Sequence, residues 1–159
     1  MKKLIIILFC LSMAFFSNCV KTHENPNYPN AIIDITIDLD RYPQLRTNGG
    51  YVYITSDIES RSRGIIVCRP ADEILAYDRL PPNYPDACTD NEGNTTRLVV
   101  ESPFVVDRCN NAFYNILNGS ILIDEAHDMV PKFPTEGVPV YPLIQYHADF
   151  DGYLIHIYN

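Results

Sequence analysis

The chain has 159 residues, of which 12 are Lys or Arg and 20 are Asp or Glu, so its formal net charge at pH 7 is −8. Such acidity argues against a nucleic-acid partner, because nucleic-acid binding depends on Lys and Arg side chains that neutralise phosphates. The length fits one domain, and the 11 Tyr, the absence of Trp and the short β-branched runs favour strands.

The N-terminal residues have the pattern of an export signal. Lys2 and Lys3 precede an apolar run over residues 4–16, and a processing site ends in Cys19. The run is too short to span a bilayer, which takes about 20 helical residues. We therefore expect residues 1–18 to be a signal peptide that is removed on export. Its removal would leave 10 basic and 20 acidic side chains.

The residue after the expected cut is a cysteine, and two kinds of signal compete here. A lipoprotein signal needs this Cys because its thiol receives a diacylglyceryl group, whereas a plain secretory signal needs small residues before the cut. The end of the signal resembles the lipoprotein type, although Asn18 stands where Gly, Ala or Ser is usual. We predict that lipid on Cys19 anchors the protein to a membrane of a bacterial cell envelope, on the periplasmic side or exposed at the surface.

Residues 19–30 contain Asn and Pro and almost no large apolar side chain after Val20, so we expect a flexible tether. The folded domain is expected over residues 31–159. Its first segment, residues 31–39, alternates apolar and polar residues from Ile33 onward, which predicts a half-buried strand.

Further strands follow in chain order. A loop over residues 41–50 leads into a strand at 51–55, and residues 64–69 and 73–77 are expected to form a hairpin around a tight connection at 70–72. Residues 78–96 are rich in Pro and Asn, and neither a helix nor a strand could run through them. They are predicted to form the first of two long irregular loops.

Strands and one further long loop are also expected in the C-terminal half. Strands are expected at 97–101 and 104–106, a hairpin at 113–123 turning at Asn118-Gly119, a second irregular loop at 124–139, and a closing hairpin at 143–158 turning at Asp151-Gly152. No stretch outside the signal has helical periodicity. We therefore predict an all-β domain of about nine or ten short antiparallel strands.

The order of these segments resembles the Rieske iron–sulfur fold over residues 32–158. In that family, a hairpin leads into a loop with a Cys-x-His motif, and a strand pair leads into a second loop with Cys-x-x-His. Residues 107–115 stand where the second motif would be, and Gly119, residues 137–143 and Gly152 match later turns and a Pro-Leu segment. The resemblance implies a Rieske-like antiparallel β sandwich or barrel with two long loops.

The metal ligands of that family are missing at the matching positions. A Rieske 2Fe–2S cluster is held by two thiolates and two imidazoles. The second motif has Asp107 and Asn110 at its Cys and His positions, and the first motif has Pro81 and Asn83. We therefore expect no metal ion, no cofactor and no enzymatic activity.

The same resemblance implies a disulfide. Some Rieske proteins join their two cluster loops from a Cys after the first motif to the middle Cys of the second, and Cys88 and Cys109 match these places. The alternative is two free cysteines. Cys68, which follows Ile65, Ile66 and Val67, is expected to be buried and unreactive.

The leading hypothesis is a non-catalytic structural or binding module of the cell envelope, with a Rieske-like domain that lacks its cluster ligands. One alternative is an electron-transfer protein that binds a 2Fe–2S cluster through other ligands. Another is a small-ligand or glycan binder that uses the two loops, for which a pocket rimmed by Tyr84, Tyr114 and Tyr141 would be the structural sign. Asp124, Glu125, His127 and Asp128 carry metal-ligating atoms, but they lack a zinc or calcium spacing and are expected to be solvated.

Overall fold

The structure is a computed structural model that describes residues 25–27, 31–55, 62–89, 91–134, 137 and 139–159. The expected signal peptide, the expected lipidation site at Cys19 and most of the expected tether lie outside the described residues. In the described part of the chain, no helix has the length and hydrophobicity that a membrane crossing requires.

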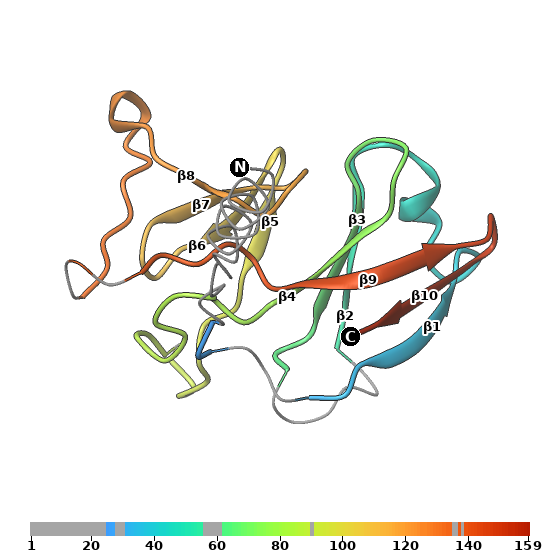
Figure 1. Ribbon diagram of the computed structural model, residues 1–159, viewed down its shortest axis with the longest axis horizontal. Helices are drawn as coiled ribbons and strands as arrows, with labels where there is room; N and C mark the ends of the chain where they lie inside the picture. Colours follow the sequence, from blue (N-terminus) through green and yellow to red (C-terminus); the bar gives the residue numbers. More distant parts are fainter. Residues whose placement is uncertain (1–24, 28–30, 56–61, 90, 135–136, 138) are drawn as a thin grey trace, which may run out of the picture.

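The larger sheet has six antiparallel strands that curve into a half-barrel (Figure 1). Its order is β1-β10-β9-β4-β3-β2, so β1 and β2 are its two edges. The strands are β1 (Asp34–Asp38), β2 (Gly50–Ile54), β3 (Ile65–Arg69), β4 (Leu75–Asp78), β9 (Gln145–Phe150) and β10 (Leu154–Tyr158).

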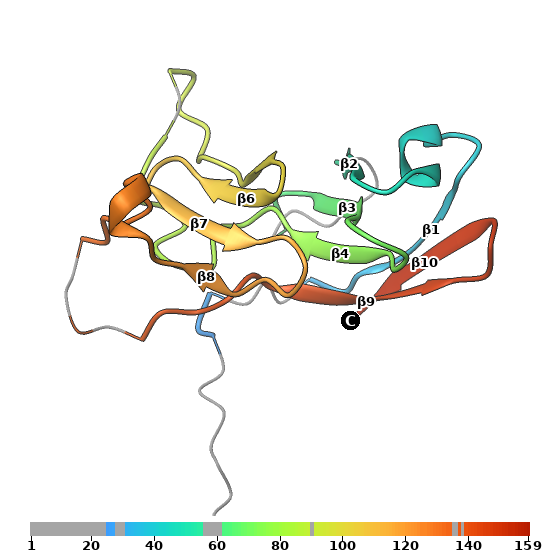
Figure 2. The same ribbon diagram turned by 90° about the horizontal axis from the view of Figure 1, so that it is seen from above.

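The smaller sheet has four antiparallel strands in the order β5-β6-β7-β8. They are β5 (Val99–Glu101), β6 (Phe104–Asp107), β7 (Ala112–Asn115) and β8 (Ile121–Leu122). Figure 2 shows this sheet at one end of the molecule and β1 and β10 at the other. The all-β prediction is confirmed, and each expected strand is present with bounds shifted by a few residues.

Two expected loops contain short 3-10 helices that were not predicted from the sequence. The first, η2 (Pro43–Arg46), has a proline in its first turn, where the missing N–H costs nothing. The second, η3 (Glu125–His127), is capped by the Asp124 carboxylate, which accepts a hydrogen bond from the Ala126 amide at 3.0 Å. Neither is long enough to give helical periodicity.

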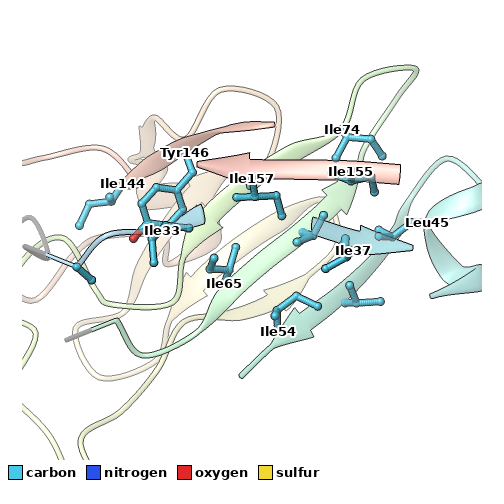
Figure 3. Close-up of a cluster of buried hydrophobic side chains, with 14 of the residues drawn as sticks. Ile33, Ile37, Leu45, Ile54, Ile65, Ile74, Ile144, Tyr146, Ile155 and Ile157 are labelled. Carbon is cyan, nitrogen blue, oxygen red and sulfur yellow. The ribbon is translucent and has the colours of Figure 1, made fainter. Parts of the chain in front are cut away.

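The core of the half-barrel follows from period-two alternation. Ile33, Ile37 and Leu39 are buried and Ile35 is half-buried, while Asp34 and Thr36 are exposed. Figure 3 shows the isoleucines of β1, β2, β3 and β10 pointing into the curve of the sheet. The predicted apolar face of residues 31–39 is therefore confirmed.

A second core joins the two sheets through β3 and β4. Ile65 and Val67 belong to the half-barrel core, whereas Ile66 and Cys68, on the opposite face of β3, pack in the second core. Cys68 is a buried free thiol, and burial raises its pKa to about 12. This position is that of an unreactive core side chain, as expected.

Candidate functional site

The first long loop of the prediction is bonded to the turn between β6 and β7 at the end of the smaller sheet. The Cys88–Cys109 disulfide joins the loop between β4 and β5 to the turn between β6 and β7, with a Cα–Cα distance of 5.9 Å. The cysteines are 21 residues apart, and closing a loop of this length stabilises the fold by about 3 kcal/mol in the chain-entropy model. The predicted pairing is confirmed.

Asp107 and Asn110 lie beside this disulfide and bind each other. Asn110 Nδ2 donates to Asp107 Oδ2 at 2.7 Å, and the Cys109 amide donates to Asp107 Oδ1 at 3.0 Å. Burial raises the pKa of the Asp107 carboxyl, and the hydrogen bonds from Asn110 and from the backbone oppose this shift. The pair therefore holds the β6–β7 turn in shape.

Asn83 plays the same part for the first loop. Its Oδ1 accepts from the Tyr141 amide at 2.9 Å, and its Nδ2 donates to the Tyr141 carbonyl at 2.9 Å and to the Tyr114 hydroxyl at 3.1 Å. Every polar atom of the Asn83 side chain is thus used within the protein. Pro81, also buried, has no side-chain donor or acceptor.

The residues at these positions do not fit a 2Fe–2S cluster. Such a cluster takes thiolates and, in Rieske proteins, neutral imidazoles. The two nearby sulfurs are bonded to each other, and the Asn83, Asp107 and Asn110 side chains are engaged in the hydrogen bonds described above. Among the described residues, no group of three or more His, Cys, Asp or Glu side chains is placed to hold a metal ion.

Two further residues fix the loops, and neither was predicted from the sequence. Arg63 Nη1 donates to the carbonyls of Pro85 at 2.6 Å and Thr96 at 2.8 Å, and its Nη2 forms an ion pair with Asp86. Asn111, at φ 50°, donates to the carbonyls of residues 128 and 130 at 2.8 and 3.1 Å. A lone Arg and an Asn in a turn give no sequence signal of such distant partners.

A hollow of about 440 Å³ opens beside Asn83. Its wall includes Tyr84 and Tyr141, together with four prolines from three segments, Pro26, Pro85, Pro134 and Pro139. Tyr84 packs against Phe133 with ring centroids 5.7 Å apart.

The predicted tyrosine rim is correct at two of its three positions. Tyr114 does not line the hollow, because the middle of β7 faces the core of the smaller sheet and leaves this side chain with 0% exposure. Its hydroxyl supports Asn83 from beneath.

The acidic segment around η3 has a structural explanation. Asp124 caps the helix, and its second carboxylate oxygen lies 2.7 Å from His127 Nδ1. The hydrogen bond with His127 lowers the pKa of Asp124. These side chains therefore act locally on a solvent-exposed loop.

No protein-family model, no curated protein and no solved structure matches this chain. The Rieske resemblance stays a prediction from segment order and motif position.

Proposed function

We propose that this protein is an exported, lipid-anchored module of a bacterial cell envelope that binds or supports a partner without catalysis. Its frame is Rieske-like, and its cluster ligands have been replaced. The observation that carries the proposal is the set of side chains at the four ligand-equivalent positions. Pro81 offers no ligand atom, and Asn83, Asp107 and Asn110 bind the protein's own loops.

The low solvent exposure of these side chains supports a non-catalytic role for this site. Asn83, Asp107 and Asn110 are 3%, 1% and 2% exposed. A general acid or base must come within hydrogen-bond reach of its substrate. Asp107, the carboxyl with a raised pKa, is instead covered by the turn that it stabilises.

The alternative function, electron transfer through a 2Fe–2S cluster, is distinguished from this proposal by measuring the iron content of the protein. The full chain would be purified anaerobically from its native membrane and assayed for iron, acid-labile sulfide, visible absorption and, after reduction, an EPR signal. We expect background iron and no signal. Stoichiometric iron and sulfide with an EPR signal would overturn the proposal.

The anchor is tested separately from the domain. Mass spectrometry of the N-terminal peptide should find a diacylglyceryl group on Cys19, and the Cys19→Ala variant should leave the membrane fraction. An unmodified Cys19 together with a soluble wild-type chain would remove the anchor from the proposal.

A second candidate function, binding of a small ligand or glycan, is favoured by the hollow next to Asn83. Two tyrosine rings and several prolines give an aromatic and apolar wall typical of ligand sites. Soluble oligosaccharides would be screened by calorimetry against wild type, Tyr84→Ala and Tyr141→Ala, with Tyr51→Ala on β2 as the control. A ligand of the hollow should lose about tenfold in affinity, or ~1.4 kcal/mol, with the first two variants only.

A further inference from the structure

The half-barrel is open between its two edge strands. Among the described residues, β1 pairs only with β10, and β2 pairs only with β3 and lies at the other end of the strand order. A hollow of about 480 Å³ lies at this opening, and its wall includes residues 35–38 of β1, Arg41, Tyr42, and Ile54 of β2. Ile37 and Ile54 point into the same interior from the two edges (Figure 3).

The outer edge of β1 presents backbone groups to this opening. The Ile33 carbonyl accepts from the Asn159 amide at 3.3 Å, and the Leu39 amide donates to the Tyr153 carbonyl at 3.2 Å. Because hydrogen-bonding direction alternates along an antiparallel strand, the odd-numbered residues face β10, and Asp34, Thr36 and Asp38 face away from it.

The Thr36 amide and carbonyl therefore point to the opening. No strand in the described part of the chain pairs with this side of β1. The Asp38 carbonyl accepts a hydrogen bond from the Arg41 amide at 3.1 Å, so it is not free to pair with an added strand. An extended chain beside Thr36 would find both a donor and an acceptor.

The side chains around the open edge indicate which residue types a docked chain would carry. On its inner side it would meet Ile35, Ile37 and Ile54, which favour apolar residues at alternate positions. The outer face and nearby turns of β1, β9 and β10 carry more carboxylates than cations. The carboxylates are Asp34, Asp38, Asp40, Asp149 and Asp151; Arg41 and Arg46 are the nearby cations. Arg46 is paired with Asp40, and Asp34 Oδ1 lies 2.8 Å from His156 Nε2. The neighbour of an added strand would be β1, whose acidic side chains are Asp34 and Asp38. Opposite charges across neighbouring strands are stabilising, so Lys or Arg should alternate with the apolar residues.

We propose that the open edge of β1 is a docking site for an extended segment of another protein, with alternating apolar and basic residues, which joins the half-barrel as an added strand. This mode of recognition takes affinity from backbone hydrogen bonds and specificity from alternate side chains. The proposal is independent of the loop site and of the function assigned to it.

The test uses the full chain purified in detergent and an acetylated, amidated peptide of alternating Val and Lys, about eight residues long. A peptide of alternating Val and Glu is the charge control. We expect the Val–Lys peptide to bind and to slow hydrogen exchange at residues 34–38, and the Val–Glu peptide to bind at least about tenfold more weakly.

Variants of β1 residues test whether the peptide binds at this edge. Thr36→Pro removes an N–H that faces away from β10, so it should spare the β1–β10 pairing and weaken peptide binding by about tenfold or more. Thr36→Ala keeps the N–H and should bind like wild type. If Thr36→Pro fails to fold, Asp34→Lys, at a side chain 74% exposed, should weaken Val–Lys binding and strengthen Val–Glu binding.

Three outcomes would overturn the proposal. One is the absence of protection at residues 34–38 with saturating Val–Lys peptide. Another is unchanged peptide affinity in a folded Thr36→Pro variant or in Asp34→Lys. The third is a wild-type dimer that Thr36→Pro makes monomeric, since the edge would then serve a second copy of this chain.

Discussion

At the scale of single residues, the buried polar side chains form hydrogen bonds either within one turn or between segments far apart in the chain. In the described part of the chain these are Asp78, Asn83, Asp107 and Asn110. Asp78 has 0% exposure and accepts from the Tyr146 hydroxyl and from the Leu80 amide, both at 2.6 Å. A buried carboxylate oxygen that loses its donor keeps the full cost of its lost hydration.

Tyr146→Phe should therefore destabilise the protein. The change removes only the hydroxyl that donates to buried Asp78, and we expect a loss of about 1–3 kcal/mol in the free energy of unfolding, measured by urea denaturation. Tyr158→Phe is the matched control, because its hydroxyl donates at 3.1 Å to the exposed Asp149. That variant should stay within about 0.5 kcal/mol of wild type. Equal losses in both variants would contradict the importance of burial.

Asp107 gives a prediction on pH. Burial raises the pKa of this carboxyl above its ordinary value of 3.8, so the folded protein favours the protonated form. The stability that this preference contributes is present below pH 3.8 and is lost as the pH rises through the raised, folded-state pKa.

The stability of wild type relative to Asp107→Asn should therefore fall with rising pH. Urea denaturation of both proteins from about pH 3 to about pH 7 measures this difference, and groups that titrate alike in the two proteins cancel. A difference that grows with pH would mean that the hydrogen bonds from Asn110 and Cys109 outweigh burial.

At the scale of elements, the disulfide is the covalent connection between the loop before β5 and the β6–β7 turn. Replacing both cysteines, Cys88→Ala with Cys109→Ala, should lower the free energy of unfolding by about 3 kcal/mol, because the unfolded chain regains the entropy of an open loop. Cys68→Ala, outside the bond, should cost less, since it removes one small buried side chain. Non-reducing peptide mapping should find Cys88 and Cys109 in one linked species, and free thiols at both would contradict the structure.

Most strands were predictable because their residues alternate strictly or form short apolar runs between Pro and Gly. β1 and the closing hairpin at Gly152 are examples. The helices η2 and η3 were not predictable, since one turn leaves no period to detect. The strand order was not predictable from local pattern either, because the pairing of β4 with β9 joins residues about 70 positions apart.

The candidate site was likewise predictable only in part. The cysteine pair followed from segment order, but the bonds that complete the site did not. Asn83 reaches Tyr141 over 58 residues, and Arg63 reaches Thr96 over 33. Nothing in the local sequence of either residue specifies these partners. Tyr114 was misplaced because its neighbours indicate a strand without saying which face is covered.

At the scale of the whole molecule, the two sheets are joined where the β7–β8 turn packs on β4. The Tyr77 hydroxyl donates to the Ile116 carbonyl at 3.1 Å, and the Leu143 amide donates to the Gly119 carbonyl at 2.9 Å. Gly119 has φ 68°, and a Cβ there would lie 3.1 Å from Leu143 Cβ and 3.3 Å from the Tyr77 ring. The close approach of the sheets thus depends on a residue without a side chain.

Gly119→Ala should therefore weaken the junction of the sheets. Gly49→Ala is the control, because Gly49 also has a positive φ, 85°, but a Cβ there meets nothing within 4 Å. Both variants bear the strain of a left-handed alanine, about 1 kcal/mol, and Gly119→Ala adds about 1–3 kcal/mol from crowding Leu143 and Tyr77. Urea denaturation measures both losses. Equal losses would mean that the sheets can separate slightly at no cost, so that the turn does not fix their packing.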